Sequence, residues 1–244
     1  MSEQTLEQPV IKKSKNSEIQ KRVERRKGII KERYRYEDPV ANQLARDTIA
    51  AELRNERQIK KDLEKEGEID HLTGIYNRRG FELHIKEELQ SAKRHNYDLT
   101  ILYLDANKFK EINDTFGHRI GDEYLIKIAQ AIKTACRSTD VFARLGGDEF
   151  AILLSDTKIE NVDSFWNRIN ELFNKSKISI NEESQSPRTI IDGLKISAGA
   201  AKVDLENCSQ SIDQADKAMY KAKEFASLTG ENTLIRFDQI HHEV

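Results

Sequence analysis

Two neighbouring carboxylates in this chain have the residue type and the local setting of a metal site. Asp148 and Glu149 directly follow Gly146 and Gly147, which separate two runs of mainly apolar residues. A Gly-Gly pair between such runs is typical of a tight β-hairpin connection. The glycines serve the backbone of the turn, so the two acids are available for another task, and oxygen ligands in a rigid turn suit Mg²⁺. Taken alone, the same residues are also typical of a solvated acidic turn.

A third carboxylate, Asp105, stands at the end of a run that predicts a buried strand. That run, Leu99 to Leu104, is apolar and rich in strand-forming residues. A carboxylate in this place is costly unless it is paired or bound to a cation. If the strand lies beside the hairpin in one sheet, Asp105 meets the two hairpin acids across a gap the size of a metal ion. Such a site holds Mg²⁺ against nucleotide phosphates, and Lys108 and Lys110 can neutralise phosphate oxygens.

Seven motifs, in order, resemble those of the GGDEF-domain diguanylate cyclases over roughly Asp70 to Phe237. They are Asp70-His-Leu-Thr-Gly-Ile-Tyr-Asn77-Arg78-Arg79, Asp105-Ala-Asn-Lys-Phe-Lys110-Glu-Ile-Asn113-Asp114, Gly117-His118-Arg-Ile-Gly121-Asp122, Arg137-Ser-Thr-Asp140, Arg144-Leu-Gly-Gly-Asp-Glu-Phe150, Ser197-Ala-Gly199 and Asp216-Lys-Ala-Met-Tyr220-Lys-Ala-Lys223. Enzymes of this family join two GTP molecules into cyclic di-GMP. The resemblance therefore implies that activity, with release of two pyrophosphates.

The resemblance also implies roles for the acids. Mg²⁺, with Mn²⁺ as an alternative, would be bound by Asp105, Asp148 and the main-chain carbonyl of Ala106. Glu149 would lie beside them, near the ribose hydroxyl, so that the catalytic set is Asp105, Asp148 and Glu149. The reaction needs two domains that face each other, each with one GTP, and a homodimer is expected.

Guanine recognition would fall to Asn113 and to a buried Asp122. A carboxylate can accept hydrogen bonds from guanine N1 and N2, whereas adenine offers no matching donors, so GTP is the expected substrate. The triphosphate would be held by residues of the segment after Asp105 together with one distant lysine: Asn107, Lys108, Phe109, Lys110 and Lys223.

Arg137 and Asp140 match the family's product-inhibition site, at which cyclic di-GMP would bind. Arginine suits a guanine edge and a phosphate, and aspartate can accept from guanine N1 and N2. By residue type alone, the two side chains are also typical of a local surface ion pair.

Two departures from the family pattern bear on the site. Asn107 stands where many relatives carry a second aspartate, which removes a charge but keeps an oxygen. A phosphate-binding arginine expected shortly after Lys223 is not visible, and Arg78 is a candidate to replace it. The competing hypothesis is a catalytically silent receptor that binds cyclic di-GMP through Arg137 and Asp140. Retention of the three acids favours the enzyme.

The elements that position these residues follow from hydrophobic spacing. Helices are predicted over Arg79–Arg94, around Leu125–Ala135, at Ile159–Asn174 and at Ser209–Ala226, strands at Leu194–Val203 and Thr233–Phe237, and a polar loop at Asn181–Pro187. This α/β (α+β) layout fits a ferredoxin-like palm, as in the family: a central mixed, antiparallel-rich sheet flanked by helices, with an N-terminal helical extension.

The 244 residues predict three parts: a flexible basic tail (1–38), a signalling or dimerisation helix that begins at Asp38-Pro39 (39–69), and a GGDEF catalytic domain (70–244). Basic runs are usually solvated, and docking to an acidic partner or membrane surface is the alternative. An input signal or a protein partner is expected to act through this N-terminal segment.

Composition excludes several classes of function. The net charge of −2 gives no general attraction to a nucleic acid polymer or a membrane. No apolar run is long enough for a transmembrane segment, and the first residues lack the apolar core of a signal peptide. The two cysteines, Cys136 in a helix and Cys208 in a loop, are isolated and expected to be reduced. We therefore expect a cytoplasmic protein.

Overall fold

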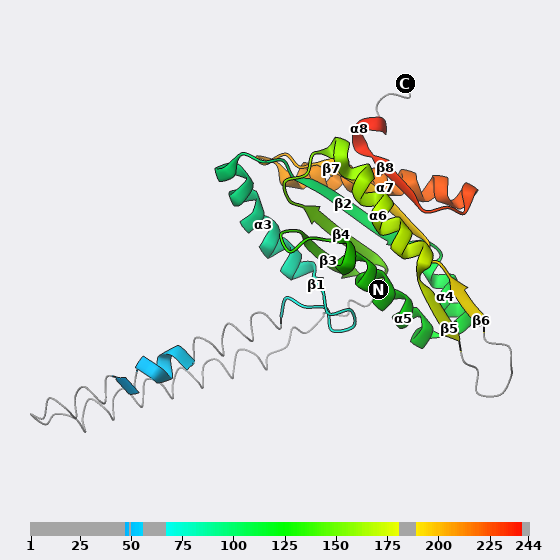
Figure 1. The fold of residues 1–244 in the computed structure, drawn as a ribbon, viewed down its shortest axis with the longest axis horizontal. Coiled ribbons are helices and arrows are strands. Elements are labelled where there is room, and N and C mark those ends of the chain that lie inside the picture. Colours follow the sequence, from blue (N-terminus) through cyan, green and yellow to red (C-terminus); the bar gives the residue numbers. More distant parts are fainter. Residues whose placement is uncertain (1–46, 49, 56–66, 181–188, 241–244) are drawn as a thin grey trace, which may run out of the picture. The chain divides into compact units, whose positions relative to one another are not determined.

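The computed structural model describes residues 47–48, 50–55, 67–180 and 189–240 (Figure 1). Residues 47–48 and 50–55 are helical. The predicted basic tail, most of the predicted N-terminal helix and the predicted loop at 181–187 lie outside the described residues. The folded unit that carries the predicted site is described below by itself.

Six strands form the main sheet, in the order β1-β3-β4-β2-β7-β8, and two further strands form a separate hairpin. The strands of the sheet are β1 (Tyr76–Asn77), β2 (Thr100–Ala106), β3 (Val141–Gly146), β4 (Glu149–Leu154), β7 (Ile196–Lys202) and β8 (Thr233–Arg236), and those of the hairpin are β5 (Lys177–Ile180) and β6 (Thr189–Asp192). The four central strands pair antiparallel, whereas the outer strands β1 and β8 pair parallel with their neighbours.

Helices cover both faces of the sheet. They are α3 (Arg78–His95), α4 (Phe109–Phe116), α5 (His118–Ala135), α6 (Val162–Lys175), α7 (Cys208–Thr229) and α8 (Phe237–Ile240), with a 3₁₀ turn η1 (Ile159–Asn161). Figure 1 shows α5 and α6 in front of the sheet. Strands β2, β3, β4 and β7 with α5 and α6 make the split β-α-β arrangement of a ferredoxin-like fold, which confirms the predicted fold class.

Alternating side chains of β2 belong to two different cores. Leu102 and Leu104 pack in the cluster that includes α5 and α6, and Leu99 and Ile101 pack with α3 and α7. Successive side chains of a strand point to opposite faces, and here both faces are covered. This is why β2 is apolar throughout until Asp105, and why that carboxylate is buried when the strand reaches the edge of the core.

The predicted helices and strands are confirmed, most of them to within a few residues at their ends, but α5 begins at His118, well before the predicted Leu125. The elements that were not predicted are the short strand β1, the short helices α4 and α8, and the β5–β6 hairpin. The expectation that Cys208 lies in a loop is wrong, because Asn207 caps α7 and the helix begins at Cys208. Both cysteines are free thiols. In the described part of the chain, no helix has the length and apolar character needed to cross a membrane.

Candidate active site

The sheet register brings the three predicted acids together. Strand β2 pairs antiparallel with β4 so that Asp105 lies opposite Glu149, and the backbone N–H of Ala106 donates to the carbonyl of Asp148 at 3.2 Å. Strand β2 and the hairpin therefore lie side by side as expected, which sets Asp105 beside the turn that carries Asp148 and Glu149. Gly147 has a φ of +52°, which permits the tight turn that sets Asp148 beside β2.

Asp105 is the buried carboxylate of this edge. Its side chain is 5% exposed, and its Oδ2 accepts a hydrogen bond from Lys223 Nζ at 2.7 Å. Its Oδ1 is buried and has no hydrogen-bond partner among the described residues. Burial raises the pKa of Asp105, the contact with Lys223 lowers it, and the charge of Asp148 raises it, so that the pKa lies above its ordinary value.

Lys223 reaches Asp105 because α7 lies directly on β7. A Cβ on Gly199 of β7 would collide with the backbone of α7 at Ala215 and Met219. The buried face of the helix also carries small residues such as Ala218. This close approach places a lysine 118 positions away in sequence on the carboxylate of β2.

The donors at this edge fit a divalent cation of the Mg²⁺ type. A buried carboxylate oxygen without a partner, with a second carboxylate close enough to raise the pKa of Asp105, supplies the hard oxygen ligands that Mg²⁺ prefers. Among the described residues, no group of three or more Asp, Glu, His or Cys side chains encloses a metal position.

The segment after β2 is held by a chain of hydrogen bonds. Asn107 Oδ1 accepts from Ser197 Oγ at 2.8 Å, and the N–H of Asn107 donates to the carbonyl of Lys195 at 2.8 Å. The N–H of Lys195 in turn donates to the buried hydroxyl of Tyr124 at 2.6 Å, and burial raises the pKa of Tyr124 to about 12. Asn107 is thus a structural anchor of the loop, which explains how an amide can stand in place of a second aspartate.

Lys108 takes a left-handed conformation, with φ of 59° and ψ of 25°, directly before α4. A side chain other than glycine rarely adopts this backbone conformation, and such strain is common at ligand-binding turns. The side chains of Lys108 and Lys110 are exposed, and Phe109 is half-buried. The N–H groups at the start of α4 and two mobile cations therefore lie next to the carboxylate edge.

The packing of α4 on α5 sets Asn113, one of the two predicted guanine-binding residues, against the residue that precedes the other. The side chain of Asn113 lies against Gly121, where a Cβ would overlap the Asn113 amide. Asp122 is the next residue. Our expectation of a buried Asp122 is wrong, because its side chain is exposed at the surface of α5. Water can therefore solvate Asp122, and the cost of leaving it without a donor is smaller than that of a buried carboxylate.

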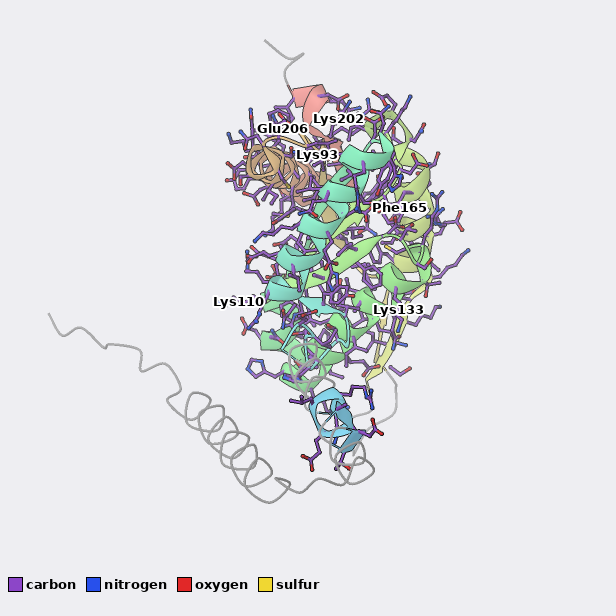
Figure 2. All side chains as sticks on the ribbon, turned by 90° about the vertical axis from the view of Figure 1, so that its left-hand side faces the viewer. Lys93, Lys110, Lys133, Phe165, Lys202 and Glu206 are labelled. Carbon is purple, nitrogen blue, oxygen red and sulfur yellow. The ribbon has the colours of Figure 1, made fainter. Side chains whose placement is uncertain are left out.

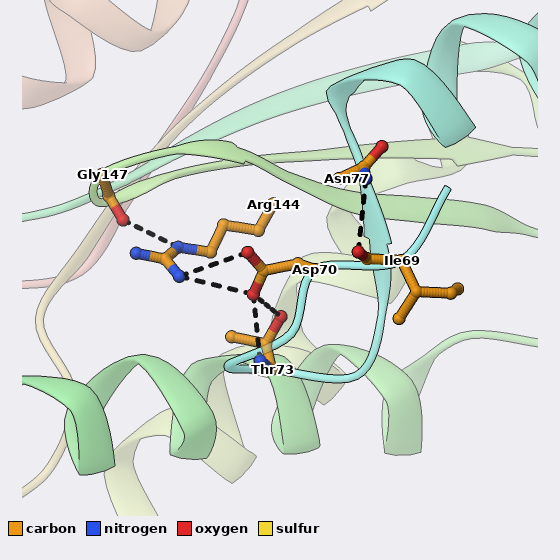
Figure 3. Close-up of polar contacts among 6 residues, drawn as sticks. All are labelled: Ile69, Asp70, Thr73, Asn77, Arg144 and Gly147. Atoms are coloured by element: carbon orange, nitrogen blue, oxygen red, sulfur yellow. Dashed lines mark hydrogen bonds and ion pairs between the residues drawn. The ribbon is translucent and has the colours of Figure 1, made fainter. Parts of the chain in front are cut away.

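Arg144 holds the tip of the β3–β4 hairpin (Figure 3). Together with Asp70 and Thr73 it forms what we call the hairpin brace. Arg144 Nε donates to the carbonyl of Gly147 at 2.9 Å, and its Nη1 lies 3.3 Å from Asp70 Oδ1. The same oxygen of Asp70 accepts from the backbone N–H and the hydroxyl of Thr73. Burial acts to raise the pKa of Asp70, but the bonds from Thr73 and the charge of Arg144 outweigh it and leave the pKa below its ordinary value. Sequence reasoning placed Asp70 and Arg144 in family motifs without a role.

Arg78, the candidate for the missing phosphate-binding arginine, also lies at the hairpin. It is the first residue of α3, which is capped by the side chain of Asn77. Its Nε donates to the carbonyl of Leu145 at 3.2 Å, and its Nη2 is 3.8 Å from Glu149 Oε2. Its side chain is 56% exposed, so the guanidinium is beside the carboxylate edge and accessible to a ligand.

The two residues of the predicted inhibition site differ sharply in exposure. Arg137 is exposed, whereas Asp140 is buried. Asp140 Oδ2 accepts from the backbone N–H of Arg137 at 2.7 Å, and its Oδ1 accepts from the N–H of Ser155 at 3.1 Å. The carboxylate of Asp140 therefore holds the turn that presents Arg137.

A groove of about 570 Å³ lies at the other end of β2 and β7, lined by residues that include Tyr97 and Leu205. Figure 2 shows Lys93, Lys202 and Glu206 near this end, away from Lys110. The charges here are paired: Lys202 lies 3.1 Å from Asp98, and Lys93 lies 3.0 Å from Glu206. The unsatisfied carboxylate of Asp105, and not this groove, marks the candidate active site.

Comparison with known proteins agrees with the motifs. The model of the family described as the diguanylate cyclase GGDEF domain matches residues 67–227. Probable diguanylate cyclase DgcC of Escherichia coli K12 is 36% identical over 156 residues, which cover 63% of this chain and 40% of that protein. Diguanylate cyclase DosC of the same organism is 35% identical over 181 residues, 73% of this chain and 38% of that protein. The chain thus spans less than half the length of these relatives.

Solved structures with the same fold include three of GGDEF proteins. Diguanylate cyclase SiaD of Pseudomonas aeruginosa, solved with its activator SiaC, has a TM-score of 0.61 at 26% identity and covers 93% of this chain and 84% of that one. A microbial GGDEF domain studied with cyclic di-GMP has a TM-score of 0.56 at 27% identity, over 71% of this chain and 99% of that one. DgcB of Caulobacter crescentus, with a TM-score of 0.66 at 22% identity over 82% of this chain and all of that one, shows the fold alone.

Proposed function

Because the chain belongs to the family of GGDEF-domain diguanylate cyclases, we propose that it condenses two GTP molecules into cyclic di-GMP and releases two pyrophosphates. The observation that carries this proposal is the partnerless buried oxygen of Asp105 at an edge where the register adds Asp148 and Glu149. A domain that bound nucleotide without catalysis would have no need to keep such a costly group.

Asp105, Asp148 and the main-chain carbonyl of Ala106 would hold Mg²⁺, or Mn²⁺ in its place. The cation supplies stabilisation of negative charge on the attacking and leaving oxygens. Lys110, Lys223 and the N–H groups around Phe109 would hold the phosphates, and Arg78 would replace the arginine missing after Lys223. Support for Arg78 comes from its exposed guanidinium, 3.8 Å from Glu149.

Guanine would be recognised by Asn113, which contacts Gly121, and by the next residue of the chain, Asp122. Since Asp122 is exposed, discrimination against ATP would come mainly from the hydrogen bonds made to guanine and less from a penalty for ATP.

Each domain would supply half of the reaction, in a homodimer. The ribose 3′-oxygen of one GTP forms a bond to the α-phosphorus of the other, and the bond from that phosphorus to the bridging oxygen breaks as pyrophosphate leaves. Glu149 would accept the hydrogen bond of the attacking hydroxyl. The same step on the second GTP closes the ring, and two facing domains bring the reactants in line.

We further propose that cyclic di-GMP inhibits the enzyme at Arg137 and Asp140. Arg137 is exposed and able to meet a guanine edge, and Asp140 would contribute by fixing the turn. The N-terminal segment, lying mainly outside the described residues, would set the dimer and receive an input signal or a protein partner. The similarity to SiaD over 93% of this chain supports a partner of this kind.

The test is to incubate the purified chain with GTP and Mg²⁺ and to identify products by mass spectrometry. Cyclic di-GMP should form, should not form after chelation of the metal, and should be lost in Asp148→Ala. Asp114→Ala, which removes an exposed carboxylate of α4, is the matched control and should stay active. Binding of cyclic di-GMP without any turnover of GTP would reject the enzyme in favour of the silent receptor.

A further inference from the structure

We propose that Lys223 is a counter-ion that competes with the divalent cation for Asp105, so that metal binds tightly only when a nucleoside triphosphate draws the lysine away. The proposal rests on the proposed function and adds an order to it: metal and nucleotide enter together, and the nucleotide-free protein has low metal affinity. Lys223 then has two successive anionic partners, first a carboxylate and later a phosphate.

Lys223 makes a short ion pair with the carboxylate of Asp105. Its Nζ lies 2.7 Å from Asp105 Oδ2, and the carboxylate side chain is 5% exposed, so water screens this pair little. The ammonium therefore occupies one of the two oxygens of the Asp105 carboxylate. A divalent cation bound to the other oxygen would lie a few ångströms from a like charge, which weakens its binding.

The other charges of the edge do not replace Lys223 in this role. Arg78 is engaged with Glu149 at the longer distance of 3.8 Å, and Lys108 lies 3.9 Å from Glu111 on its own helix. Asp148 raises the pKa of Asp105 by its negative charge, so without the lysine two close carboxylates repel each other. Either an ammonium or a metal ion relieves that repulsion, and the two alternatives compete.

The lysine can also leave. Its side chain is 44% exposed, although its carboxylate partner is buried. Lysine is a point charge on a flexible four-carbon stem, and it binds carboxylate and phosphate oxygens alike. When phosphates arrive beside the start of α4, the ammonium can exchange one anion for another at little cost. Asp105 is then released with both oxygens available.

An opposite role can be imagined for the same contact. If Lys223 served to orient Asp105 for the metal, its removal would weaken metal binding. Counter-ion and orienting roles therefore predict changes of opposite sign, and an affinity measurement on nucleotide-free protein separates them.

The experiment titrates the full chain with Mn²⁺ alone, without nucleotide, and follows free Mn²⁺ by electron paramagnetic resonance. Lys223→Met should bind Mn²⁺ at least tenfold more tightly than the unaltered chain. Lys223→Arg, which keeps the charge, should bind no more than about threefold more tightly. Lys217→Met removes an exposed lysine of the same helix and should leave the affinity unchanged, which controls for net charge. Circular dichroism confirms that each variant is folded.

An affinity in Lys223→Met equal to or weaker than that of the unaltered chain would overturn the counter-ion role. Adding Asp105→Asn separates this from failure of the proposed function. If Asp105→Asn abolishes Mn²⁺ binding but Lys223→Met does not strengthen it, the metal assignment stands and the role of Lys223 is wrong. If Mn²⁺ binding is insensitive to Asp105→Asn in both backgrounds, the metal assignment fails and this inference fails with it.

Discussion

Two regions of the domain bury aspartates in opposite ways. At the edge of the sheet, one oxygen of Asp105 accepts from a lysine and the other has no partner among the described residues, and the pKa of Asp105 is raised. At the hairpin brace, Asp70 accepts from Thr73 and Arg144, and its pKa is lowered. The brace pairs its charge fully, whereas at the edge one carboxylate oxygen has no hydrogen-bond partner among the described residues. Unsatisfied burial is thus the better sign of function in this molecule.

The largest effect is expected where the carboxylate is unsatisfied. Asp105→Asn should lower the rate of cyclic di-GMP formation by more than about a hundredfold, because charge stabilisation by the metal is worth several kcal/mol. The melting temperature should stay equal or rise, since a costly buried charge is removed. Rates with GTP and Mg²⁺ and thermal melts check both parts, with Asp114→Asn as the control. Near-normal turnover would remove Asp105 from the metal site.

Asp140 extends the comparison, because it is buried like Asp105 but each of its two carboxylate oxygens accepts a hydrogen bond. Asp140→Ala should lower the free energy of unfolding by about 2 kcal/mol, since the N–H groups of Arg137 and Ser155 lose their acceptor. Urea unfolding measures this change.

Arg137→Ala is the matched partner of that variant. It should leave stability unchanged and raise the concentration of cyclic di-GMP needed for inhibition at least tenfold, because a charged contact contributes about 1.5 to 3 kcal/mol. Undiminished inhibition in Arg137→Ala would refute the inhibition site without touching the structural role of Asp140.

The brace predicts a smaller, mixed effect. Arg144→Gln removes the ion pair with Asp70 and the hydrogen bond from Arg144 Nε to the Gly147 carbonyl. It should lower the free energy of unfolding by about 1 kcal/mol. Turnover should fall about tenfold because Asp148 is less well placed. Arg119→Gln, on an exposed site of α5, should change neither. A loss of stability with full activity would make the brace purely structural.

The smallest effect is a difference in pH dependence. The lowered pKa of Asp70 means that its stabilisation is present above its ordinary value of 3.8 and is lost as pH falls through the folded pKa. The raised pKa of Asp105 means that its charge costs stability at neutral pH, a cost that disappears as pH falls below the folded pKa towards 3.8.

Urea unfolding between neutral and acidic pH tests both signs. Asp70→Asn should be less stable than the unaltered chain at pH 7, by about 1 kcal/mol, and should approach it at low pH. Asp105→Asn should be more stable at pH 7 and should also converge at low pH. Equal curves for the two variants would mean that their environments do not differ as described.

Local patterns in the sequence were sufficient to predict much of the fold and the positions of the three acids. The end of an apolar run marked Asp105, and the Gly-Gly turn marked Asp148 and Glu149, because strand burial and hairpin geometry depend on a few consecutive residues. Helix α4 was missed although Phe109, Ile112 and Phe116 have helical spacing, because eight residues are fewer than the window over which such a pattern is judged. The exposure of Asp122 was missed because it depends on how α4 packs on α5.

By itself, then, the sequence determined which carboxylates sit where strands end and turn, since short-range sterics and hydrophobic burial decide that. Only the tertiary structure decided which of them are satisfied. The contacts of Lys223 with Asp105, of Arg144 with Asp70 and of Asp140 with Ser155 join residues 118, 74 and 15 positions apart. Such pairings depend on the approach of whole elements, as α7 approaches β7 over Gly199, and no local spacing contains that information.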